Sequence, residues 1–233
     1  MRKSFVIAVA TGALLALTGI APAQAQDSRA AGKGKAELSV LHGVPGAVVD
    51  VYVNGALTLD NFTPGSLAGP LTLAAGTYSV AITGADALDA SAPIIGPVDL
   101  TLKRGKCYTA VAHLSEAGAP TATLFKNDQS AVKRGQGRLT VRHVAAAPAV
   151  DVLANGAVAI AGLTNGNQAK LKLPVGTYSA AVALAGTTAP VIGPADVTVV
   201  KRTNTIVYAW GSAADGSLNI AVQTVALKPC VKR

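Results

Sequence analysis

A histidine and an aspartate recur at matching positions in two stretches of the chain that lie 101 residues apart. The first stretch, LSVLHGVPGAVVDVYVNG, contains His42 and Asp50, and the second, LTVRHVAAAPAVDVLANG, contains His143 and Asp151. Imidazole and carboxylate groups can bind metal ions, and together they can act as a general acid and base. The repeated residues therefore raise the question of whether each copy holds a chemical site.

The alternation of residues within each stretch argues against such a site. His42 has the same parity as the apolar residues Leu38 and Val40, whereas Asp50 has the parity opposite to that of the valines beside it. In a strand, residues of opposite parity lie on opposite faces of the sheet. We therefore predict that each histidine closes a strand end by bonding to turn backbone, and that each aspartate braces a neighbouring turn on the other face.

Few other residues are available to complete a catalytic or metal centre. A metal ion needs three or four converging ligands, and His113 is the only further histidine. The chain has no G-x-S-x-G, H-E-x-x-H or phosphate-loop motif. We expect a protein that is not an enzyme and holds no cofactor or metal ion, with an enzyme of unrecognised type as the alternative.

The same stretches also carry turn signals. Each ends in an Asn-Gly dipeptide, which favours a tight reversal between two strands because both residues tolerate positive φ. The repeated polar positions are His42, Asp50, Asn54, His143, Asp151 and Asn155.

Further matches between the two halves indicate a duplicated β-domain. The run LTLAAGTYSVAI from Leu71 corresponds to LKLPVGTYSAAV from Leu171. Apolar residues alternate with a period of two, and no helical period follows residue 25. We predict an all-β protein of two tandem antiparallel β-sandwich domains with immunoglobulin-like topology, with small Greek-key barrels as the alternative.

Composition shifts suggest where the parts of the chain begin and end. The expected parts are a signal peptide (1–25), a disordered tail (26–36), a first sandwich (37–125), a linker (126–137), a second sandwich (138–227) and a basic C-terminal tail (228–233).

The basic residues lie mostly in the tail, the linker, the turns and the C-terminus. We expect most of them, Arg138 among them, to be ordinary solvated surface.

The N-terminus has the features of a cleaved secretory signal. Arg2 and Lys3 precede an apolar run of about 16 residues, followed by the A-x-A site that ends at Ala25. A membrane anchor is the alternative, but the run is shorter than the roughly 20 residues that a spanning helix needs. Cleavage removes two positive charges, which lowers the formal charge from +8 to +6. We expect a mature chain without a transmembrane anchor, secreted or held at the cell envelope.

Export gives the two cysteines a clear interpretation. Cys107 and Cys230 are the only cysteines, and disulfides persist in oxidising compartments. We predict a bond between them, with free thiols or an intermolecular bridge as alternatives.

The sequence as a whole resembles a known family. The runs LHGVPGAVVDVYVNG, GTYSVAI, CYTAVAHL and LTVRHVAAAPAVDV together are similar to the domain of unknown function 4397 family of exported bacterial proteins, over nearly the whole mature chain. The family usually has an acidic Ser-Pro-Asp-Ala-Pro turn after the histidine, which this chain lacks in both copies. The resemblance implies export and a β-sandwich, and it implies no reaction.

Composition also bears on partners. The mature chain is modestly basic, which favours an anionic cell-wall polymer over nucleic acid for an exported protein. Aromatic residues make up only 4% of the chain, and Tyr52 is the one whose parity is polar, so a sugar-binding platform has little support. We expect a structural or interaction protein of the envelope, or alternatively a module that binds a surface glycan, a surface protein or an anionic polymer.

Overall fold

The computed structural model describes residues 34–228, and all the regular structure in them is β-strand. The predicted signal peptide, most of the predicted tail and Cys230 lie outside these residues. No helix in the described part of the chain is long and apolar enough to cross a membrane.

The described residues form two sets of eight strands, one for each sequence copy. The first set is β1 (Lys35–Gly43), β2 (Val49–Val53), β3 (Ala56–Phe62), β4 (Leu67–Ala74), β5 (Gly76–Gly84), β6 (Ile95–Leu102), β7 (Cys107–Leu114) and β8 (Pro120–Lys126). The second set is β9 (Gln136–Ala146), β10 (Val150–Ala154), β11 (Ala157–Leu163), β12 (Gln168–Pro174), β13 (Gly176–Leu184), β14 (Pro190–Val199), β15 (Thr203–Ser212) and β16 (Asn219–Ala226).

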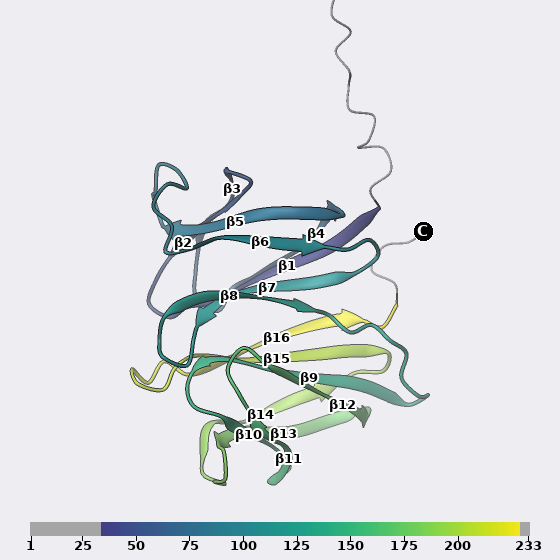
Figure 1. The fold of residues 1–233 in the computed structure, drawn as a ribbon. Coiled ribbons are helices and arrows are strands. Elements are labelled where there is room, and N and C mark those ends of the chain that lie inside the picture. Colours follow the sequence, from purple (N-terminus) through teal and green to yellow (C-terminus); the bar gives the residue numbers. More distant parts are fainter. Residues whose placement is uncertain (1–33, 229–233) are drawn as a thin grey trace, which may run out of the picture. The chain divides into compact units, whose positions relative to one another are not determined.

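Each set forms two four-stranded sheets with the same strand order (Figure 1). In the first copy the orders are β4-β1-β7-β8 and β3-β2-β5-β6, and in the second they are β12-β9-β15-β16 and β11-β10-β13-β14. All pairings are antiparallel except β1 with β7 and β9 with β15. The prediction of two tandem β-sandwich domains is confirmed.

The strand order adds a detail that the sequence pattern did not contain. In an immunoglobulin constant domain the first and second strands share a sheet. Here β1 pairs with β4 and β7, while β2 lies in the other sheet with β3 and β5. The domains are therefore immunoglobulin-like in their layers but not in their strand order.

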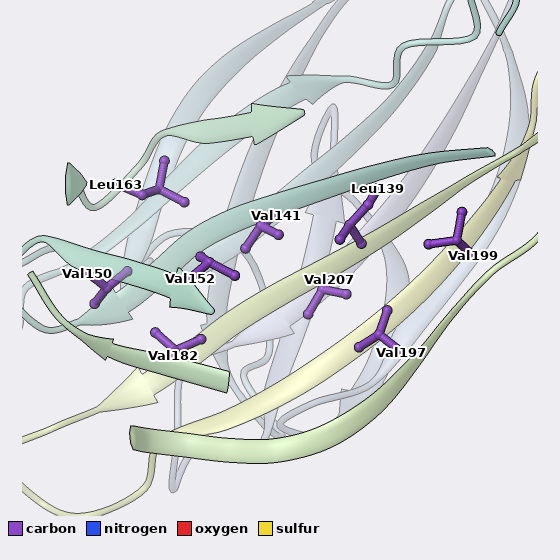
Figure 2. Packing of buried hydrophobic residues seen from close by; sticks show 9 residues of the cluster. All are labelled: Leu139, Val141, Val150, Val152, Leu163, Val182, Val197, Val199 and Val207. Carbon is purple, nitrogen blue, oxygen red and sulfur yellow. The ribbon is translucent and has the colours of Figure 1, made fainter. Parts of the chain in front are cut away.

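Side chains from both sheets fill the interior of each sandwich. The core of the second domain consists of residues from β9, β10, β11, β13, β14 and β15. Figure 2 shows its nine buried members: Leu139, Val141, Val150, Val152, Leu163, Val182, Val197, Val199 and Val207. Burial of a side chain of this size contributes about 1.5 to 3 kcal/mol relative to its exposure. Equivalent positions, including Leu38, Val51 and Ile82, form the interior of the first domain.

A further apolar cluster joins the two domains through the outer faces of β1, β7 and β8 and of β9, β15 and β16. It contains Leu41, Val111 and Phe125 from the first copy, and Val144, Ile206, Tyr208 and Trp210 from the second. The strands β7 and β15 are therefore buried on both faces, which explains their nearly continuous apolar runs. The described residues 34–228 accordingly belong to one compact unit.

The segment between the two sets of strands is fixed by hydrogen bonds. Arg138 is only 2% exposed, and its guanidinium donates to the backbone carbonyls of Asp128 and Ser130 at 3.0 and 3.1 Å. The expectation that Arg138 belongs to the solvated surface is therefore wrong. Residues of its parity on β9 face the other domain and not water, so a cation there needs internal acceptors.

Candidate functional site

The two repeated histidines close equivalent turns. The Nε2 of His42 bonds to the carbonyl of Ala47 at 2.8 Å, and the Nε2 of His143 bonds to the carbonyl of Pro148 at 2.9 Å. Because each Nε2 donates, each Nδ1 is left to accept a longer bond from the backbone amide two residues along the chain. Both side chains are 1% exposed, so their polar atoms serve the turns that follow β1 and β9.

The two repeated aspartates hold the neighbouring hairpin through backbone amides. Asp50 accepts a bond from the amide of Asn61 at 2.8 Å, and Asp151 accepts one from Gly162 at 2.7 Å. Asn61 and Gly162 both have positive φ and lie within register shifts of the hairpins β2–β3 and β10–β11. Asp151 also accepts from the amide of Gly186 at 2.9 Å, and these backbone bonds lower the pKa of its carboxyl group.

The repeated asparagines form the tight reversals expected of Asn-Gly. Asn54 and Asn155 both have φ of 51°, and the glycines that follow them also have positive φ, as a type I′ turn requires. Each asparagine side chain accepts a bond from the backbone amide of the facing strand, at Ser79 and Ser179 respectively.

These six polar residues therefore do not form a chemical site in either copy, because each one bonds to a different turn or hairpin. Within residues 34–228 no hydrogen bond joins a repeated histidine to a repeated aspartate, and no three His, Cys, Asp or Glu side chains gather as metal ligands would. Tyr52, whose parity is polar, is 5% exposed, because the loop after β5 covers it and its hydroxyl donates to the carbonyl of Ala87.

The most unusual polar group is the buried guanidinium of Arg142, between the two domains. Arg142 is 0% exposed, and it donates to the hydroxyl of Tyr208 at 2.6 Å, to Oδ1 of Asn127 at 2.8 Å and to Oε1 of Gln168 at 3.0 Å. Its guanidinium carbon also lies 4.4 Å from the ring centroid of Phe125. Neutral acceptors and an aromatic face thus surround a buried cation.

Further bonds extend this cluster across both copies. The hydroxyls of Tyr208 and Thr109 both donate to Oε1 of Gln223, at 2.6 and 3.0 Å, and the amide of Asn127 donates to the hydroxyl of Thr109. Thr109 lies on β7 and Gln223 on β16, so the network ties the first domain to the second. We call Arg142, Tyr208, Gln223, Asn127, Thr109 and Gln168 the interdomain network.

The interdomain network lies where the two copies have diverged. Arg142 and Tyr208 are directly paired on β9 and β15, and the corresponding pair on β1 and β7 is Leu41 and Val111. All four residues face the interface between the domains. One copy therefore supplies a polar pair and the other an apolar pair to the same buried surface.

Burial and charge shift several pKa values in this region. Burial lowers the pKa of Arg142, although contact with Tyr208 opposes the shift. Burial raises the pKa of the Asp128 carboxyl, but hydrogen bonds from Ser130 and the charge of Arg138 outweigh it and bring that pKa down to about 2. Asp128 lies 3.3 Å from both Arg138 and Lys170, so its carboxylate is neutralised locally.

The three buried histidines should make the protein less stable in mild acid. Burial is the main cause that lowers the pKa values of His42, His113 and His143 below 6.5. The charge of His143 lowers the pKa of His113 further, whereas the charge of Glu116 opposes the shift at His143. A histidine whose pKa is lower in the folded state stabilises the protein fully above about pH 6.5 and less as the pH falls. We expect the free energy of unfolding, measured in urea, to fall between about pH 7 and pH 5.

The replacement His143→Gln tests the source of that pH dependence. It should reduce the slope of stability against pH over this range, because glutamine does not titrate. The Asp128 carboxyl titrates far below this range and does not contribute to it. A slope unchanged by the replacement would show that other groups are responsible.

Comparison with known proteins gives one family. The family model DUF4397, described as a domain of unknown function, matches residues 36–153, from β1 to β10. No curated protein matches the chain. Among solved structures, the Bacillus anthracis TIE protein is 20% identical, with 76% of this chain and 33% of that chain covered and a TM-score of 0.23. This chain thus spans about a third of that protein, and a likeness at this TM-score has no bearing on fold or function.

Proposed function

The chain belongs to the DUF4397 family, and on that premise we propose that it is an exported protein without catalytic activity. In this proposal the two sandwiches form one rigid structural or interaction module, secreted or held at the cell envelope. The signal-like N-terminus supports export.

One observation carries the structural interpretation. The polar residues repeated in both copies are engaged with backbone groups of their own turns and hairpins, and the interdomain network around Arg142 connects the two domains. A catalytic group needs a polar atom that can reach a substrate. Side chains that are buried and already bonded to backbone serve the fold instead.

Fractionation of cells that produce the full chain tests this proposal. We expect the protein in the envelope or the medium, with Gln26 as its first residue. The double variant Asp50→Asn/Asp151→Asn keeps an acceptor oxygen in each hairpin but removes both carboxylates, and it should show the same distribution. Full-length protein in the cytoplasm would contradict export. A folded double variant distributed differently between envelope and medium from the unmodified protein would contradict a purely structural role for the aspartates.

Export also allows the predicted disulfide between Cys107 and Cys230. Cys230 lies outside the described residues, but Lys228, two residues before it, lines the same cleft as Cys107 and Glu37. The short separation in sequence supports a C-terminus that reaches Cys107. We expect the mass of the intact mature protein to rise by about 2 Da on reduction. An unchanged monomer mass would exclude the bond, and a dimer that reductant dissolves would indicate the intermolecular alternative.

A further inference from the structure

We infer that the cleft between the β6–β7 turn, the end of β8 and the start of β12 binds a linear polymer that carries phosphate groups. The cleft has a volume of about 1140 Å³. The proposal rests on the export proposed above only for the source of the polymer, because the binding itself is a property of the folded chain.

Positive charge is concentrated in this cleft. Its lining includes Arg104 and Lys106 from the β6–β7 turn, Lys126 from β8 and Lys170 from β12. The side chains of all four residues are exposed to solvent. Arginine and lysine are the side chains that bind phosphate most strongly, through charge-assisted hydrogen bonds.

The single carboxylate in the lining does not cancel this charge. Asp128 lies 3.3 Å from the buried Arg138, which is not part of the lining, as well as from Lys170. Four cations against one carboxylate leave a net formal charge of +3 on the lining. A concave surface of one sign focuses the potential and attracts ions of the opposite sign.

Two polar residues of the cleft are held in place by hydrogen bonds. Asn127 and Gln168 line it, and both also bond to the guanidinium of Arg142 in the interdomain network. The cleft therefore exists only while the two domains are packed together, since its cations come from both copies. A preorganised site loses less entropy on binding than a flexible surface does.

Size and charge spacing favour a polymer over a single small anion. Pockets for small molecules typically have volumes of about 300 to 1000 Å³, and this cleft is larger and open to solvent. Its cations are distributed over three separate elements, which suits several phosphates along a flexible chain. The described residues contain no helix to enter a DNA groove, so we commit to a flexible single-chain polymer.

Binding of long-chain inorganic polyphosphate to the purified mature protein tests the inference. Affinity should fall steeply with salt, because each cation that contacts a phosphate releases a counterion. The variant Arg104→Ser/Lys106→Ser/Lys126→Ser should bind at least about 10-fold more weakly and reduce the salt slope by about 2. Far-ultraviolet circular dichroism checks that the variant is folded.

A matched variant separates the cleft from general attraction. Lys133, Arg134 and Lys201 are exposed and do not line the cleft, so their replacement by serine removes the same charge elsewhere. This control should bind polyphosphate nearly as well as the unmodified chain. Equal losses in both variants, or no loss in the cleft variant, would overturn the inference. Tighter binding to a short DNA duplex than to polyphosphate would overturn the choice of a flexible polymer.

Discussion

Replacement of Arg142 by alanine should lower the free energy of unfolding by about 3 to 5 kcal/mol. The guanidinium is fully buried, and its loss removes one donor each from the hydroxyl of Tyr208 and from the side-chain oxygens of Asn127 and Gln168. Buried acceptors without a donor cost about 1 to 3 kcal/mol each, although relaxation of the interface reduces the sum. Urea unfolding of the mature chain measures the change.

Two further variants make the Arg142 prediction specific. Arg134→Ala removes an exposed guanidinium, so it should change stability by no more than about 0.5 kcal/mol. Arg142→Lys keeps the charge but not the planar fork that reaches three acceptors, so we expect an intermediate loss. If Arg142→Ala and Arg134→Ala gave equal stability, the interdomain network would contribute nothing to the fold.

The second large effect is expected at Trp210, the only tryptophan in the chain. Its side chain is 7% exposed in the cluster between the domains, and its ring packs against Gly65 of the first copy so closely that a Cβ there would lie 2.9 Å from Cζ2. Replacement of a buried tryptophan by alanine typically costs about 3 to 5 kcal/mol. We expect Trp210→Ala to lose stability in this range and to loosen the contact between the domains.

Phenylalanine provides the control for Trp210. The indole N–H has no hydrogen-bond partner within residues 34–228. Trp210→Phe therefore removes part of the aromatic ring but breaks no hydrogen bond. It should cost clearly less than Trp210→Ala, as measured by circular dichroism in urea. A similar loss for both variants would mean that the apolar contact with the first domain is not what Trp210 supplies.

The sequence predicted the repeated turns well because their causes are local. Asn54 and Asn155 precede glycine, which favours a reversal with positive φ in either copy. The alternation in the sequence placed His42 on the core-facing side at the end of a strand. In the structure its imidazole bonds to the turn that follows that strand. The sandwich class likewise followed from the period of two and the duplication.

The interface between the domains could not be predicted in this way because its cause is not local. Arg138 and Arg142 alternate with core residues on β9, which is also the pattern of an exposed polar face. Only contact with the other copy makes that face buried. A signal was present in the nearly continuous apolar run of β15, and in the substitution of Arg142 for the Leu41 of the first copy, but neither identifies the partner surface.

The strand order within each sheet also could not be predicted from the alternation of apolar residues. Alternation indicates which residues face a core, but it does not say whether β1 pairs with β2 or with β7. The observed pairing places the outer faces of β1 and β7 side by side, and these faces carry the first copy's contribution to the interface.

A buried apolar cluster joins the cores of the two sandwiches, and we expect the two domains to unfold as a single unit. Equilibrium unfolding of the mature chain, followed at once by Trp210 fluorescence and by far-ultraviolet circular dichroism, tests it most directly. Trp210 reports on the interface, and circular dichroism reports on the strands of both domains. We predict coincident transitions with one midpoint, because loss of either domain exposes the apolar cluster between them. Two separate transitions, with the fluorescence of Trp210 unchanged in one of them, would contradict the account.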